Sequence, residues 1–354
     1  MNDSWHWQEP GTAWRGVGIY HVTLTVTDRQ PLLGELIIPD NDPKQAYVKA
    51  SHLGIALLEC LKSIPTFHPE IQVLQYCLMP DHLHAIWYVR QTMNVGIRYV
   101  AQGFERAAKR IGRAYSYTRL SGGTTNERYI ACEEENLLSS IVSAGSREDP
   151  LRQILGAEAY GQLPSLFTER PFIRPMSRKG QLQTMIRYVQ LNPQRLATKR
   201  LKPEYFYVQE GVEINGRIYS AVGNSKILME AQRSPVHVRH TMVDEAQHGD
   251  DKRLRDYMDS CLNAAQNGAV MVSPFINQYE REVLDHLIQD KRPVIYIADN
   301  GFRDYYKPSA HLFDAVDAGN MLILSPWEYD PMQKHVSRAK CVEMNNIAEE
   351  ICQL

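Results

Sequence analysis

Two histidines one residue apart, His82 and His84, are the side chains in this sequence whose spacing best suits metal chemistry. They lie in the segment 77–86, which reads CLMPDHLHAI. On a β-strand, residues two apart project from the same face, so the two imidazoles would stand side by side and could share one metal ion. The alternative is a pair of unrelated histidines on a half-exposed strand.

A second segment, 185–193 (MIRYVQLNP), contains a side chain that could act as a nucleophile. On a helix, Tyr188 and Asn192 are one turn apart and share a face. Because Asn192 precedes a proline, the helix should break or kink there, which would leave the amide at a helix end. The alternative is a core tyrosine followed by a capping asparagine.

The elements that would hold these segments form a small sheet. Alternation with β-branched residues predicts a strand at 17–27, and two further strands, 71–78 and 82–90, are joined by the turn Met79-Pro80-Asp81. Apolar spacing predicts a helix at 45–61 and a basic amphipathic helix at 95–115. This order predicts an antiparallel sheet with helices on one face. The strand residues expected to bury against the helices are Leu83, Ala85, Trp87 and Val89.

Residues 121–165 read as an insertion with little core of its own and one short helix near 151–160. Beyond it, helices are expected at about 180–191 and at 194–199. The nucleophile candidate therefore lies on the first helix after the insertion.

The remainder of the chain follows another pattern. Three short apolar runs (268–274, 294–297 and 319–325) alternate with helical stretches at 277–290 and 309–318. Continuous apolar strands separated by helices are typical of a parallel α/β sheet that is buried on both faces. We expect a second, smaller domain whose boundary with the first lies near residues 235–250.

Composition and charge narrow the function classes. The 354 residues are 44% hydrophobic and 23% charged, which is normal globular usage for about two domains. Six cysteines without a CxxC pair argue against a disulfide scaffold or zinc ribbon and suit a cytoplasmic protein, and no signal peptide or membrane span is expected. Counting Lys and Arg against Asp and Glu, residues 1–240 carry +6 and residues 241–354 carry −8. The first part is therefore the candidate for binding a polyanion.

Taken together, the two motifs resemble the REP-associated tyrosine transposases, which are single-tyrosine HUH endonucleases. In that family the strand reads approximately Met-Pro-Asn/Asp-His-hydrophobic-His, and a later helix carries Tyr before an Asn-Pro or a Gln. Segments 20–25 (YHVTLT) and 166–172 (LFTERPF) are also similar to the family, and the resemblance spans about 15–200. It implies an α+β fold: a ferredoxin-like antiparallel sheet with helices on one face, in a domain of residues 1–235.

The resemblance implies metal-dependent cleavage and strand transfer of single-stranded DNA through a 5′-phosphotyrosine intermediate. Tyr188 matches the nucleophile, His82 and His84 match the metal ligands, and Asn192 stands where a third ligand is often supplied. Elementary chemistry agrees, since a free tyrosine is mostly protonated at neutral pH and a divalent ion stabilises charge on a phosphodiester. We expect Mg²⁺ or Mn²⁺ as the cofactor.

Single-stranded or hairpin DNA is the expected partner, with no membrane and with a homodimer as one oligomeric alternative. Tyrosines at 99, 115, 117 and 129 could stack on bases, and His21 could either face the site or pair on the sheet. The basic side chains expected to hold the phosphate backbone are Arg98, Arg106, Lys109, Arg110, Arg113, Arg174, Arg178, Lys179, Arg187 and Arg195.

The acidic part, residues 250–354, is distantly similar to the Rossmann-like α/β domain of DNA-processing protein A. The glycine-rich loop after the first strand is replaced here by residues 273–277 (SPFIN), which weakens the case for nucleotide binding. This part could be a degenerate scaffold, a dimerisation module or a regulator.

Two other functions are consistent with the same residues. One is a hairpin-binding protein of the same fold that has lost cleavage. The other is a small-molecule metallohydrolase that uses His82 and His84, but it leaves Tyr188 and the +7 charge of residues 151–200 unexplained.

Overall fold

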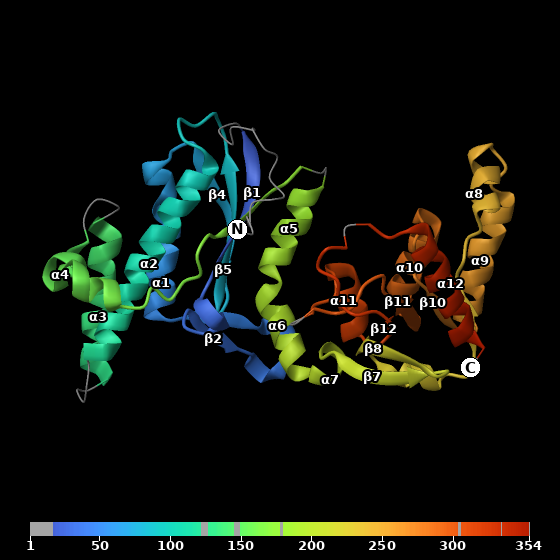
Figure 1. Cartoon of the computed structure of the whole chain (residues 1–354). Coiled ribbons are helices and arrows are strands. Elements are labelled where there is room, and N and C mark those ends of the chain that lie inside the picture. The colour runs from blue at the N-terminus through green and yellow to red at the C-terminus, as the bar shows by residue number, and fades with distance from the viewer. Residues whose placement is uncertain are drawn as a thin grey trace. The chain divides into compact units, whose positions relative to one another are not determined.

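The computed structural model shows a mixed α+β chain that divides into two compact units, Met1–Ala197 and Thr198–Leu354 (Figure 1). The residues that the structure describes are 17–121, 127–144, 149–177, 180–303, 306–333 and 335–353.

The first unit is built on a four-stranded sheet in the order β4-β5-β1-β6, in which every neighbouring pair is antiparallel. The predicted first strand and the predicted hairpin are both confirmed. The strands are β1 (Gly18–Thr25), β4 (Ile71–Leu78), β5 (His82–Val89) and β6 (Phe172–Pro175).

Strand alternation gives this sheet two different faces. On one face, helices α1 (His52–Phe67) and α2 (Ile97–Ser121) cover the core, and the Trp87 ring lies 6.0 Å from the ring of Phe104 in α2. Helix α5 (Gln181–Gln190) lies on the opposite side of the sheet from α1 and α2 (Figure 1). The four strand residues predicted to face the helices are all buried in this core: Leu83, Ala85, Trp87 and Val89.

The predicted helix at 45–61 is wrong over its first turns. Residues Tyr47–Ala50 form strand β3, which pairs antiparallel with β2 (Gly34–Ile37). Ser51 ends that strand and begins the helix, because its hydroxyl accepts a hydrogen bond from the Gly54 amide and donates one to a backbone carbonyl. In the sequence, the boundary between β3 and α1 is marked by a helix-capping serine, Ser51, that follows the strand.

Residues 121–165 contain more helix than the one short helix that was expected. They contain α3 (Glu127–Ala144) and α4 (Pro150–Gln162), and both helices contribute side chains to the main hydrophobic core of the unit. Segments 122–126 and 145–148 lie outside the described residues. The buried side chains that join the core are Leu138, Ile141, Leu151 and Tyr160.

The predicted break before Pro193 is present. Helix α5 ends at Gln190, Leu191 caps it, and α6 (Asn192–Leu201) begins directly afterwards. Ala197 of α6 is fully buried against the β2–β3 hairpin, and the Gln194 side chain donates a hydrogen bond of 2.9 Å to the Lys44 carbonyl. These contacts fix the direction of the chain immediately after Tyr188.

The second unit contains a six-stranded sheet in the order β7-β8-β12-β11-β10-β9. The three predicted apolar runs form β10, β11 and β12, which are parallel neighbours. The predicted boundary at 235–250 falls too late, because β7 and β8 pair with each other and β8 pairs with β12. The strands are β7 (Gln209–Ile214), β8 (Arg217–Gly223), β9 (Arg233–Pro235), β10 (Val270–Ser273), β11 (Val294–Ile297) and β12 (Met321–Ser325).

Two separate hydrophobic clusters pack on this second sheet, as expected for strands buried on both sides. None of the helices in the described residues is apolar over enough length to cross a membrane. The helices of the unit are α7 (Pro203–Phe206), α8 (His240–Gln247), α9 (Lys252–Gln266), α10 (Gln278–Gln289), α11 (Ala310–Asp317) and α12 (Arg338–Cys352). Short 3-10 turns lie at Thr27–Arg29, Pro39–Asn41 and Pro43–Gln45 in the first unit and at Ser225–Met229 in the second.

Replacing Gly54 with alanine should lower the free energy of unfolding by about 1–3 kcal/mol, the usual cost of overpacking. The reason is that a Cβ there would lie 2.0 Å from the Leu33 carbonyl oxygen. Gly103→Ala is the matched control, since no atom lies within 4 Å of its Cβ position, and it should stabilise α2 by about 0.5–1 kcal/mol. Urea denaturation measures both, and equal effects would contradict the packing of α1 on Leu33.

Candidate functional site

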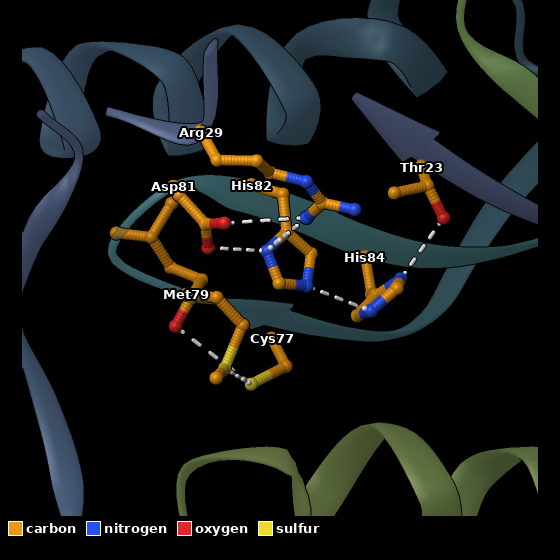
Figure 2. Close-up of polar contacts among 8 residues, drawn as sticks. Thr23, Arg29, Cys77, Met79, Asp81, His82 and His84 are labelled. Atoms are coloured by element: carbon orange, nitrogen blue, oxygen red, sulfur yellow. Dashed lines mark hydrogen bonds and ion pairs between the residues drawn. The ribbon is translucent and has the colours of Figure 1, made fainter. Parts of the chain in front are cut away.

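His82 and His84 project from β5 on the face that is not packed against α1 and α2. Their Nε2 atoms lie 3.1 Å apart, and the ring centroids are separated by 4.6 Å. Figure 2 shows the two rings side by side, each held at its other nitrogen by a neighbouring side chain. The strand therefore brings the two rings together as the sequence predicted.

Asp81 orients His82. Its Oδ1 lies 2.6 Å from His82 Nδ1, and its Oδ2 accepts a hydrogen bond of 3.2 Å from Arg29 (Figure 2). Burial raises the pKa of Asp81, but the hydrogen bond from His82 and the charges of His82 and Arg29 outweigh burial, so the pKa is lowered overall. The carboxylate is therefore ionised and accepts a hydrogen bond from the N–H group at Nδ1, which leaves His82 Nε2 as the unprotonated nitrogen.

Thr23 and His21 orient His84 in the same way. His84 Nδ1 lies 2.9 Å from Thr23 Oγ1 and 3.0 Å from His21 Nε2. Burial, followed by the charges of Arg174 and His82, lowers the pKa of His21 to about 4, so this ring is neutral at pH 7. We assign the proton on His84 to Nδ1. This leaves Nε2, the nitrogen that faces His82, unprotonated.

This arrangement fits a shared metal ion. With metal–nitrogen bonds of about 2.1 Å, two ligands of one ion are separated by about 3.0 to 3.4 Å, and the observed separation is 3.1 Å. Each ligand also has the outer hydrogen bond that metal-bound histidines usually make. Within the described residues, no group of three or more His, Cys, Asp or Glu side chains is placed to hold a metal ion.

Tyr188, on α5, reaches the same face of the sheet. Its ring centroid lies 5.7 Å from that of His84 and 6.4 Å from that of His21, both with edge-on geometry. The guanidinium carbon of the buried Arg195 lies 5.9 Å from the centroid of the Tyr188 ring. The phenol and the imidazoles, far apart in the sequence, are thus neighbours.

Asn192 is buried at the first position of α6. The expected helix end is therefore confirmed, while its role as a third metal ligand stays a prediction.

The predicted DNA-binding residues that the structure describes lie on two sides of the first sheet. Arg174 pairs with His21 across β1 and β6, and the Arg195 guanidinium lies near the Tyr188 ring, so these two are close to the site. Arg187 precedes Tyr188 on α5 and is exposed. Arg178 and Lys179 lie outside the described residues. The group on α2 lies on the other face of the sheet, away from the histidines: Arg98, Arg106, Lys109, Arg110 and Arg113.

Of the side chains that orient the histidines, the sequence singled out only His21, which faces the site through its contact with His84. Asp81 directly precedes His82 and was visible as part of the motif. Thr23 and Arg29 could not be assigned, because their contacts depend on the register that places Thr23 opposite His84 and on the turn after β1.

Comparison with known proteins gives limited similarity. No family model matches the chain. An uncharacterized protein of Haemophilus influenzae is 27% identical over 73 residues, which covers 21% of this chain and 37% of that protein. A solved structure of a REP-associated tyrosine transposase bound to a REP hairpin covers 52% of this chain and 72% of its own, at 12% identity and a TM-score of 0.23.

The lowered pKa of His21 predicts a specific dependence of stability on pH. Because the unfolded histidine has a pKa near 6.5 and the folded one a pKa of about 4, the unfolded state binds the proton more readily between these values. The contribution of His21 is therefore present at neutral pH and lost as the pH falls from about 6.5 to 4, with a slope of up to about 1.4 kcal/mol per pH unit.

His21→Gln should remove this one-proton component. Denaturant unfolding of both proteins at several pH values between 7 and 4 measures the difference in slope. Identical slopes would show that His21 titrates normally in the folded protein.

Proposed function

We propose that this protein is a metal-dependent endonuclease and strand transferase of the transposase type, which acts on single-stranded or hairpin DNA through Tyr188. The observation that carries the proposal is the position of the Tyr188 ring, 5.7 Å from the ring of His84. A tyrosine from one segment and two histidines from another meet on one face of a sheet. Acting together, they are suited to cleaving a phosphodiester.

His82 and His84 would hold a divalent ion, Mg²⁺ or Mn²⁺, and Asn192 is the proposed third ligand. When bound, such an ion polarises the phosphoryl oxygens and stabilises the charge that develops in the transition state. The chain's own contribution is orientation: Asp81 fixes the tautomer of His82, and Thr23 and His21 hold the outer nitrogen of His84.

Tyr188 would perform the covalent step. Its phenol oxygen forms a bond to phosphorus and gives up its proton, while the bond between phosphorus and the 3′ oxygen breaks. The 3′ oxygen leaves with the electron pair and takes up a proton, which yields a free 3′-hydroxyl and a 5′-phosphotyrosine. Reversal by a 3′-hydroxyl of another strand rejoins DNA without an external energy source, because the phosphotyrosine bond conserves the energy of the original linkage.

The charges around Tyr188 suit a polyanionic substrate. Arg174 and Arg187 are exposed, and segment 151–200 carries a charge of +7. Exposed arginines on these two elements, β6 and α5, would hold phosphates of the DNA backbone. We further propose that the first sheet is of the HUH, ferredoxin-like type and that the second unit is a Rossmann-like domain.

Tyr188→Phe should abolish covalent attachment to DNA while leaving DNA binding within about twofold of wild type, because only the nucleophilic oxygen is lost. A fluorescent hairpin oligonucleotide with a single-stranded tail is incubated with each protein and Mn²⁺, and the products are separated on a denaturing gel. Tyr207→Phe, a change at an exposed tyrosine of the second unit, is the matched control and should leave the adduct unchanged. An adduct formed by the Tyr188→Phe protein would refute the assignment, and binding without any wild-type adduct would favour a hairpin-binding protein.

Metal binding should require both histidines. His82→Ala and His84→Ala should each eliminate Mn²⁺ binding measured by calorimetry, and Asp81→Asn should weaken it by about 10- to 100-fold through loss of the outer hydrogen bond. His68→Ala, which changes a histidine on the loop between α1 and β4, should bind Mn²⁺ as wild type does. Full affinity in either of the first two variants would exclude the pair as the metal site.

A further inference from the structure

A cavity of about 770 Å³ lies between α2 and α4. It is on the side of the first sheet opposite His82, His84 and Tyr188. Five cationic side chains line it, together with a single carboxylate, that of Asp149. A cavity with such an excess of positive charge favours an anionic occupant. The five are Arg106, Lys109, Arg110, Arg113 and Arg152.

The contacts within the protein satisfy only part of this charge. Lys109 forms an ion pair of 2.8 Å with Glu105, and Asp149 accepts a hydrogen bond from Tyr160. The Nε atoms of Arg110 and Arg113 are buried, and no hydrogen-bond partner for them lies in the described part of the chain. Buried guanidinium donors usually have an acceptor, and the two side chains that carry these nitrogens also line the cavity.

Aromatic and apolar surfaces accompany the charges. The Arg113 guanidinium lies 5.0 Å from the centroid of the Tyr160 ring, and that of Arg106 lies 5.7 Å from the ring of the exposed Tyr99. Tyr99, Arg106 and Arg110 also line an adjoining cavity of about 290 Å³ whose other walls come mainly from apolar residues of α1, α2 and α3. A charged compartment beside an apolar, aromatic one matches a phosphate group attached to a planar base.

These residues cannot hold the phosphate that reacts at Tyr188. Phe104, on α2 between Tyr99 and Lys109, packs on Trp87, which projects from β5 to the side opposite His82 and His84. The sheet thus separates the α2 cations from the histidines. Their chemistry therefore needs a different explanation from the one that the sequence predicted for them.

We propose that the cavity between α2 and α4 is a second nucleotide-binding site, which takes the phosphates and one unstacked base of a DNA strand at a distance from the cleavage site. The identity of the strand as DNA rests on the proposed function, whereas recognition of a phosphate-bearing nucleotide rests on the cavity alone. Such a site would anchor the substrate while another part of the strand reaches Tyr188.

The test is binding of a fluorescent hairpin oligonucleotide with a single-stranded tail, measured by anisotropy in EDTA at several salt concentrations. Arg106 and Arg152 are both exposed and come from different helices, so the double variant Arg106→Gln/Arg152→Gln should fold normally. Its dissociation constant should rise about tenfold, and the slope of log affinity against log salt should fall by about 1.4, the value for two lost single-strand phosphate contacts. Lys62→Gln, an exposed cation of α1 that lines neither cavity, should match wild type.

The outcomes separate this inference from the proposed function. A double variant with the affinity and salt slope of Lys62→Gln would overturn the second site. Displacement of the oligonucleotide by a deoxynucleoside monophosphate would support the cavity's nucleotide chemistry and identify a free nucleotide as its source. Because no cleavage occurs in EDTA, a wild-type protein that forms no adduct with Mn²⁺ would remove the proposed function and leave the binding result intact.

Discussion

The facing Nε2 atoms of His82 and His84 are the interaction on which this site depends. They lie 3.1 Å apart because each ring is anchored at its other nitrogen, one by the Asp81 carboxylate and one by Thr23 and His21. Two basic nitrogens that point at each other repel unless a proton or a cation lies between them. The surrounding side chains therefore prepare this position for positive charge before any ligand arrives.

The fold supplies this geometry from both sides of the sheet. On one side, α1 and α2 bury Trp87 and its neighbours, which fixes the pleat of β5 and with it the direction of both histidines. On the other side, α5 brings Tyr188 against His84, and the break at Leu191 lets α6 pack on the β2–β3 hairpin. A shift of one residue in β5 would turn both imidazoles into the core.

The parts of the fold and of the site that could be predicted from the sequence are those set by patterns within a short stretch of residues. The hairpin that carries His82, the helix break before Pro193 and the parallel strands of the second unit follow from alternation, proline and apolar runs, which are short-range patterns. The orientation of His84 by Thr23 and the assignment of β7 and β8 to the second sheet depend on pairings between distant strands. The alternation in β5 predicted the face that the helices cover, so the cations of α2 belong to the side away from the histidines. Assigning them to the phosphate that reacts at Tyr188 did not follow from that pattern.

Mass spectrometry of the protein after reaction with single-stranded DNA tests the central claim most directly. Trypsin should release residues 188–195 (YVQLNPQR) as one peptide, because cleavage follows Arg187 and Arg195. After incubation with a hairpin oligonucleotide and Mn²⁺ and digestion of the attached DNA, the account predicts this peptide with a nucleotide 5′-phosphate on Tyr188, and no such product with EDTA. A nucleotide attached to a different residue, or the unmodified peptide alone under both conditions, would contradict it.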